Sequence, residues 1–70
     1  MKEIIYSYHA EKRMKQRGIT SLEVEHVLKH PSYVKKSFEG IKEAVGQIQN
    51  REIKIEFVET ESYIKIVTIM

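Results

Sequence analysis

Cysteine, tryptophan and aspartate are absent from this chain of 70 residues, and proline occurs only once. Without cysteine, neither a disulfide nor a thiolate zinc site can hold the fold together, and nothing in the composition points to an oxidising compartment. The apolar runs are far shorter than the roughly 20 residues of a membrane span, and Met1–Glu3 does not resemble the start of a signal peptide. A glycine-rich phosphate-binding loop is also missing. We therefore expect a cytoplasmic protein with no membrane contact and no cofactor.

The chain is short, and its charge is unevenly distributed. Hydrophobic residues make up 41% of it, enough for the core of one domain over residues 1–70 but not of two. The net charge of +2 is too small to predict nucleic-acid binding by itself. Residues 8–17 nevertheless carry four cations against Glu11, and Lys35 and Lys36 form a second basic pair. These clusters predict either a local cationic face or an ordinary solvated surface of mixed charge.

Local signals predict a first helix over residues 8–17. Ser7 is a suitable N-cap, because its side chain can accept a hydrogen bond from the first turn. Gly18 suits the left-handed position that ends a helix, and Lys15 and Arg17 favour the negative end of the helix dipole. A short β-prone segment, residues 3–6, precedes this helix.

A second helix is predicted over residues 21–29. Thr20 and Glu23 have the spacing of a capping box, in which each side chain bonds the backbone of the other. Pro31 disfavours helical geometry in the residue before it, so the helix ends there. The two helices should form a hairpin joined by residues 18–20.

After Pro31 the hydrophobic pattern becomes alternating, which is typical of strands. The predicted strands are Tyr33–Ser37, Ile41–Ile48, Glu52–Val58 and Tyr63–Ile69. Because the breaks between them are short, successive strands should form hairpins and hence a four-stranded antiparallel sheet. One face should be covered by the helices, with an inward set of Ile53, Ile55, Phe57, Ile64 and Ile66. The predicted fold class is α+β, with a short N-terminal strand before the helical hairpin.

The alternation places some β-branched residues on the face opposite to this inward set. They are drawn from Val45, Val58, Val67 and Ile69. They predict a partly apolar far face of the sheet, which a homodimer or another protein partner would cover. Alternatively, β-branched residues simply suit strands on either face. Gly46, inside a predicted strand, indicates a bulge or a close backbone approach, for which the first helix is the expected neighbour.

The first helix carries the best candidates for chemistry. His9, Arg13 and Arg17 are spaced four apart, so they form one stripe at the border of the face that Ala10 and Met14 would bury. Metal-independent RNA cleavage needs such groups: an acid or base to move a proton, and fixed positive charge around the phosphate.

A structural interpretation of the same stripe stays open. The arginines could pair with Glu43, Glu56 or the terminal carboxylate, and His9 could cap a backbone group. If the stripe does bind RNA, the further cations expected to contact it are Lys12, Lys35, Lys36 and Arg51.

Other candidate sites are weaker. His26 and His30 have a spacing that can bind a metal ion, but no cysteine or aspartate is available to complete the site, so we predict no metal site. DNA recognition by the second helix is disfavoured, because Glu23 and Glu25 would face the phosphates of a major groove.

Two stretches carry a resemblance to a known family. The segment "HAEKRMKQRGIT", followed by "LEVEHVLKHPSYV", resembles the family named domain of unknown function 4258. Members open with a strand that leads into His-Ala-x-x-Arg-Met-x-x-Arg-Gly-Ile, and the likeness continues to the Ile-x-Ile-Val-Thr pattern at residues 64–68. That family in turn resembles the small RNase folds that include RelE-like and ParE-like toxins, barnase and the colicin nucleases.

The resemblance implies a RelE-like fold and a metal-independent endoribonuclease of toxin type, with a cognate antitoxin as its partner. The implied motif residues are His9, Arg13 and Arg17, with Thr68 on the last strand as a contributor. A fold is shared more widely than a reaction, and ParE-like members do not cut RNA. The alternative function is a non-catalytic module that binds protein or RNA, in which the stripe is structural.

Overall fold

The computed structural model describes residues 2–36 and 39–70, which form two helices and five strands. In chain order they are β1 (Glu3–Tyr6), α1 (Tyr8–Arg17), α2 (Ser21–Lys29), β2 (Tyr33–Lys36), β3 (Lys42–Ile48), β4 (Arg51–Glu59) and β5 (Tyr63–Ile69). Both helices have the predicted bounds. The predicted last residue of the β2 segment, Ser37, lies outside the described residues.

The predicted caps account for the helix bounds. Ser7 Oγ accepts a hydrogen bond from the Ala10 backbone N–H at 3.1 Å, and Gly18 ends α1 in the left-handed conformation with φ 66°. In α2, Thr20 Oγ1 accepts from the Glu23 N–H, while the Glu23 carboxylate accepts from the Thr20 N–H at 2.8 Å. The capping box is therefore complete.

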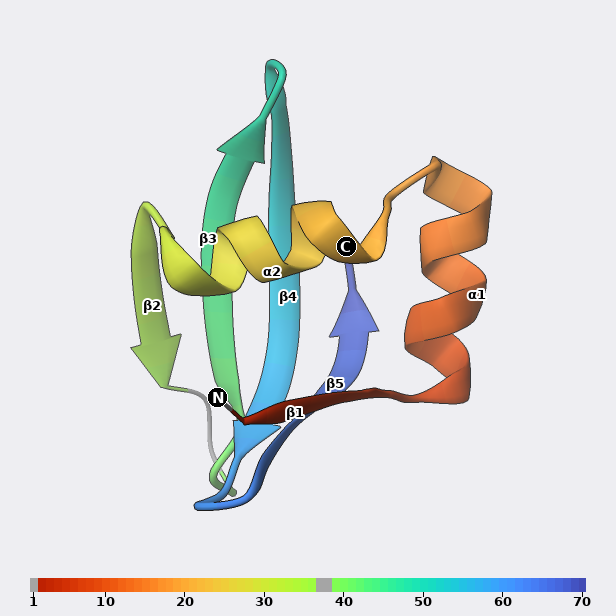
Figure 1. The fold of residues 1–70 in the computed structure, drawn as a ribbon. Coiled ribbons are helices and arrows are strands. Elements are labelled where there is room, and N and C mark those ends of the chain that lie inside the picture. The colour runs from red at the N-terminus through yellow and green to blue at the C-terminus, as the bar shows by residue number, and fades with distance from the viewer. Residues whose placement is uncertain (1, 37–38) are drawn as a thin grey trace.

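The α+β class is confirmed, but the sheet is larger than predicted. It is a five-stranded mixed sheet with the order β1-β5-β4-β3-β2 (Figure 1). Neighbours among β2, β3, β4 and β5 pair antiparallel, whereas β1 pairs parallel with β5 in the register Ile4↔Ile64 and Tyr6↔Ile66. A four-stranded, purely antiparallel sheet was the wrong prediction, because no turn links the first and last strands to reveal their pairing.

The core lies between α2, α1 and one face of the sheet. It contains most of the predicted inward set, with Ile53, Ile55 and Ile66 at most 2% exposed, and Val24 and Val27 of α2 fully buried against them. Gly46 is a place of close approach, as predicted, but its neighbour belongs to the second helix. A Cβ on Gly46 would lie 3.0 Å from Val27 Cγ1. The expected contact with the first helix was therefore wrong.

A β-bulge in β5 changes which side chains face the core. The register passes from Phe57↔Ile66 to Glu56↔Thr68, so Val67 is an extra residue on β5. This resets the alternation: Thr68 turns to the face opposite α2, and Ile69 turns into the core with no exposed surface. The prediction that Ile69 lies on the far face was wrong for this reason.

The sheet face opposite α2 is called the helix-free face below. The strand alternation places on it Glu43, Val45, Gln47, Glu52, Lys54, Glu56, Val58, Lys65 and Thr68. Val45 is only 2% exposed, and Val58 and Val67 are half-buried within the single chain. The face is mainly polar at its centre, whereas Ile5 and Tyr33, which share it as partners of Lys65 and Val45, are 39% and 51% exposed near its two edges.

Candidate functional site

Helix α1 lies beside the free edge of β5, just beyond the point where β1 ends (Figure 1). Ser7, between β1 and α1, fixes it there: its N–H donates to the Ile66 carbonyl at 3.0 Å, and its hydroxyl donates to the carbonyl of the bulge residue Val67 at 2.6 Å. Within α1 only Ala10 is buried and Met14 half-buried, while the other eight side chains are exposed. The helix is thus anchored at its start and solvated along most of its length.

The two flanks of α1 face different sides of the sheet. Glu11, Met14 and Lys15 line a depression together with residues 18–20, which lead into α2, so this flank faces α2. Successive residues turn by about 100° around a helix axis, which places His9 and Arg13 on the opposite flank. That flank borders the helix-free face.

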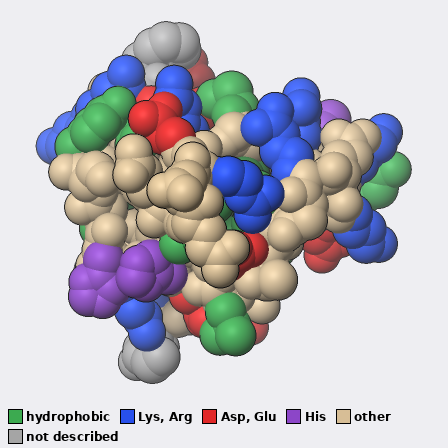
Figure 2. All heavy atoms as spheres, turned by 90° about the horizontal axis from the view of Figure 1, so that it is seen from above, with side chains coloured by type: hydrophobic (Ala, Val, Ile, Leu, Met, Phe, Trp, Pro, Cys, Tyr) green, Lys and Arg blue, Asp and Glu red, His purple; other side chains and the backbone are tan. Residues whose placement is uncertain are grey.

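The flank with His9 carries a second depression. It has a volume of about 250 Å³ and is lined by His9, Lys12, Arg13 and Gln16. Lys and Arg side chains lie over the α1 side of the molecule and also over the opposite side (Figure 2). All four lining residues are exposed, so their polar atoms are available to a ligand.

Neither motif arginine is used in the fold through its guanidinium group. Among residues 2–36 and 39–70, the guanidinium groups of Arg13 and Arg17 make no ion pair and no side-chain hydrogen bond. The pairs to Glu43, Glu56 or the terminal carboxylate that the structural interpretation offered are not formed in that part of the chain. The His9 ring lies edge-on to the Tyr8 ring, with centroids 6.1 Å apart. Arg13 is therefore free to hold an anion beside the imidazole.

Arg17 does not join the depression around His9. It is the last residue of α1, and its backbone carbonyl accepts a hydrogen bond from Arg51 Nη1 at 2.8 Å. Arg51 also contacts Glu23, with Nη2 3.5 Å from the carboxylate. Arg51 thus fastens the α1–α2 junction to the start of β4, a role that the sequence did not reveal.

The predicted RNA-contacting lysines are split between two regions. Lys12 lies on α1, in the depression with His9. Lys35 and Lys36 lie on β2, which is the edge strand at the other end of the sheet from β5 and α1. Lys35 Nζ is 3.6 Å from the Glu43 carboxylate. Only Lys12 therefore belongs to the same cluster as the motif residues.

Thr68 lies near α1 because of the bulge. It follows Val67, the residue that Ser7 holds, and it projects from the helix-free face that the His9 flank borders. Glu56 of β4 is its direct cross-strand partner, and Glu43 of β3 is the partner of Glu56 on the other side. Thr68, Glu56 and Glu43 thus form a row that runs away from α1.

The sequence indicated for Glu56 only a role as an ion-pair partner of the arginines on α1. It is half-buried, and it makes no ion pair with any described residue. Its outward position follows from strand alternation, but its place beside Thr68 depends on the bulge, which no sequence signal indicated.

The remaining histidines form a separate pair. His26 and His30 lie at the end of α2, with ring centroids 5.3 Å apart, and both are exposed. In the described part of the chain, no group of three His, Cys, Asp or Glu side chains is placed to hold a metal ion. Within the same residues, neither helix has the length and apolarity to cross a membrane.

Two groups outside the site have perturbed pKa values. Burial raises the pKa of Tyr6 above its ordinary value, and the negative charge of Glu25 raises it further. The pKa of the Glu59 carboxyl is lowered by a hydrogen bond from Lys2 and by the charges of Lys2 and Lys42. Both effects arise near β1, because Tyr6 is its last residue and Lys2, which donates to Glu59, directly precedes it.

A family model for a domain of unknown function, DUF4258, matches residues 6–70. The chain belongs to the DUF4258 family. No curated protein and no solved structure matches it significantly. The match covers α1 with its histidine and arginines, α2, and strands β2 to β5 of this DUF4258 domain, and of β1 it includes only Tyr6.

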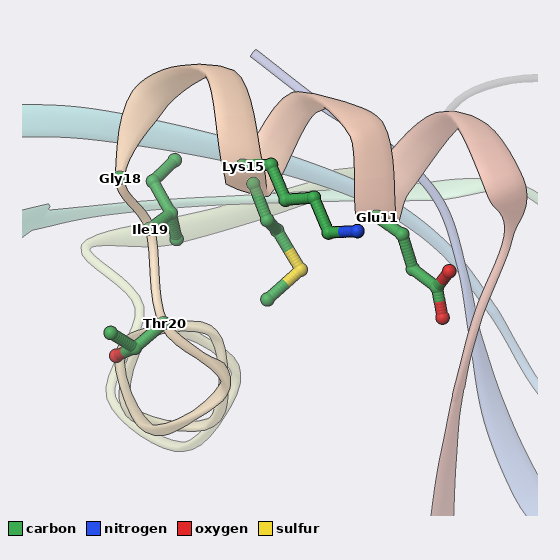
Figure 3. A pocket seen from close by; sticks show the side chains of 6 residues that line it. Glu11, Lys15, Gly18, Ile19 and Thr20 are labelled. Atoms are coloured by element: carbon green, nitrogen blue, oxygen red, sulfur yellow. The ribbon is translucent and has the colours of Figure 1, made fainter.

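The depression on the α2-facing flank of the DUF4258 domain differs in character. It has a volume of about 570 Å³, and Met14 and Ile19 supply its apolar wall (Figure 3). Glu11, Lys15 and Thr20 lie around it. Near it, Leu22 at the start of α2 is 75% exposed. This region is suited to apolar contact rather than to phosphate binding.

Proposed function

We propose that this DUF4258 protein is a metal-independent endoribonuclease of the small toxin type. One observation carries the proposal: His9 and Arg13 lie side by side on the flank of α1 that borders the helix-free face, exposed and without ion-pair partners in the described chain. The order of two helices followed by hairpin-linked strands supports the resemblance to RelE-like folds, which the sequence motifs suggested.

The chemistry follows from the groups present. A guanidinium group can hold two phosphate oxygens through parallel hydrogen bonds, and it stabilises the extra negative charge that develops as the phosphorus gains a fifth oxygen. His9 can carry a proton to or from the reacting oxygens near neutral pH. Lys12 and Gln16 in the same depression can bind neighbouring phosphate or ribose oxygens.

The test is RNA cleavage by the purified chain in excess chelator, on mixed-sequence oligoribonucleotides and on purified ribosomes. We expect cleavage by the unaltered protein, and a loss of about 100-fold or more in His9→Ala, the usual range for removing an acid–base group. Arg13→Ala should also lose activity, because the phosphate is no longer clamped.

Two matched variants serve as controls. His26→Ala removes an exposed histidine from α2, and Lys15→Ala removes a cation from the other flank of α1. Both should cleave at nearly the rate of the unaltered protein. Equal loss in His26→Ala and His9→Ala would refute the assignment, and failure of the unaltered protein to cut any of these RNAs would refute the function.

The second candidate function is a protein-binding module. It is favoured by the apolar depression of Met14 and Ile19 and by the exposed Leu22 beside it. In that case substitution of Met14 by a charged residue, and not of His9, would abolish partner binding. An antitoxin contacting this side of the molecule would be compatible with both candidates.

A further inference from the structure

Cleavage of RNA through its own 2′-hydroxyl needs two proton transfers, and α1 supplies a group for only one. A base must take the proton of the attacking 2′-hydroxyl, and an acid must protonate the departing 5′-oxygen. The only carboxylate on α1, that of Glu11, lies on the α2-facing flank, away from His9. The missing group must therefore come from the sheet.

The helix-free face offers three central carboxylates, and two of them are already paired. Glu43 Oε1 lies 3.6 Å from Lys35 Nζ, and Glu52 Oε1 lies 3.9 Å from Lys54 Nζ. Glu56 makes no ion pair or side-chain hydrogen bond within residues 2–36 and 39–70. Of the three, it is the one with an uncommitted carboxylate.

Glu56 also has the right place in the sheet. Its strand, β4, is the neighbour of β5, and α1 lies along the free edge of β5. Direct cross-strand partners have Cβ atoms about 5 Å apart, so Glu56 and Thr68 are adjacent on the helix-free face. A phosphodiester lying over Thr68 would have Glu56 on one side and the His9 flank of α1 on the other.

The bulge is the device that produces this arrangement. If β5 had no bulge, regular alternation would place the Thr68 side chain on the same face of the sheet as Ile66, pointing into the core. Bulges redirect side chains in this way and are common beside active sites. Ser7 holds the bulge carbonyl while it caps α1, so one residue fixes the positions of Thr68 and of the start of α1 together.

We infer that Glu56 is a catalytic residue, the general base that complements His9, and this inference rests on the proposed function. The Glu56 carboxylate takes the proton of the 2′-hydroxyl as the 2′-oxygen forms a bond to phosphorus. The bond from phosphorus to the 5′-oxygen breaks, its electron pair stays on that oxygen, and the His9 imidazolium gives it a proton. The products are a 2′,3′-cyclic phosphate and a 5′-hydroxyl, and exchange with water restores both side chains.

The charged neighbours of Glu56 on the helix-free face are Glu43 on β3, Lys54 on its own strand and Lys65 on β5. Arg13 and His9 lie on α1. The rate should rise with pH as Glu56 loses its proton and fall as His9 loses its own, which gives a bell-shaped profile.

The test compares Glu56→Gln with Glu43→Gln, its neighbour on the same face, in chelator and on the RNAs used above. Glu56→Gln should cleave about 100-fold more slowly, lose the acidic limb of the pH profile, and still bind an oligonucleotide with 2′-deoxyribose as well as the unaltered protein does. Glu43→Gln should retain activity within about threefold. Because Glu56→Gln removes a charge that opposes Glu43, it should fold, which circular dichroism can check.

Glu56→Asp is a second variant that keeps the carboxylate but withdraws it by one methylene. It should be slower than the unaltered protein and should keep the acidic limb. A decrease of less than about tenfold in Glu56→Gln, or an acidic limb that survives in it, would overturn the role of Glu56 and leave the nuclease proposal standing. Absence of cleavage by the unaltered protein would overturn both.

Discussion

Ser7→Ala is the substitution that most directly tests how α1 is held beside the sheet. The Ser7 side chain makes two hydrogen bonds: it accepts from the Ala10 N–H at 3.1 Å and donates to the Val67 carbonyl at 2.6 Å. Loss of an N-cap costs about 1 kcal/mol. A partly buried carbonyl left without its donor costs about 1 to 3 kcal/mol more. We therefore expect Ser7→Ala to lower the free energy of unfolding by about 2 to 4 kcal/mol.

The assay is thermal unfolding followed by circular dichroism. For a domain of this size, 1 kcal/mol corresponds to about 4–8 °C in Tm, so the expected decrease is about 8–32 °C. Thr20→Ala is the matched control, because Thr20 caps α2 in the same way but makes no bond to the sheet. It should lose only about 1 kcal/mol. Ser7→Thr keeps the hydroxyl and should unfold near the original temperature.

Equal losses in Ser7→Ala and Thr20→Ala would refute the role given to the hydrogen bond from Ser7 to Val67. If Ser7→Ala and Thr20→Ala lower the Tm equally, the bond from Ser7 to the bulge contributes nothing. In that case the bulge does not hold α1 in place, and the argument that Ser7 aligns Thr68 with the start of α1 is wrong.

Two further predictions concern Tyr6 and Gly46. Because the folded-state pKa of Tyr6 is raised by burial and by Glu25, its contribution to stability is complete below its ordinary pKa of 10.0 and is lost as the pH rises through the higher folded-state value. Urea unfolding at about pH 9 and 11 should show a larger loss in the unaltered protein than in Tyr6→Phe, and an equal loss in both would contradict this. Gly46→Ala should cost about 1 to 3 kcal/mol, because the new methyl group would meet Val27 Cγ1 at 3.0 Å. In the double variant with Val27→Ala the total cost should be less than the sum of the two single costs, so strict additivity would contradict the clash.

The helices could be predicted from the sequence because their ends are marked by local chemistry. Ser7, Gly18 and the Thr20–Glu23 capping box each act within four residues, so the signal does not depend on the rest of the fold. The inward residues of β4 could be predicted for a similar reason, since alternation over a regular strand needs no information from elsewhere.

The features that shape the candidate site were not visible in the sequence, because they depend on contacts between distant segments. The parallel pairing of β1 with β5 joins the two ends of the chain without any turn signal. The bulge at Val67 reverses the alternation after Ile66, so simple parity places Thr68 and Ile69 on the wrong faces. The stripe on α1 also loses Arg17, whose carbonyl is held by Arg51 from β4.

We propose that RNA binds between the His9 flank of α1 and the helix-free face. The most direct measurement is a nuclear magnetic resonance titration with a mixed-sequence oligoribonucleotide that carries 2′-O-methyl groups, which prevent cleavage. We expect shifts at His9, Arg13 and Thr68, with little change at Met14 and Ile19. Shifts confined to Met14 and Ile19, or no shifts at all, would contradict it.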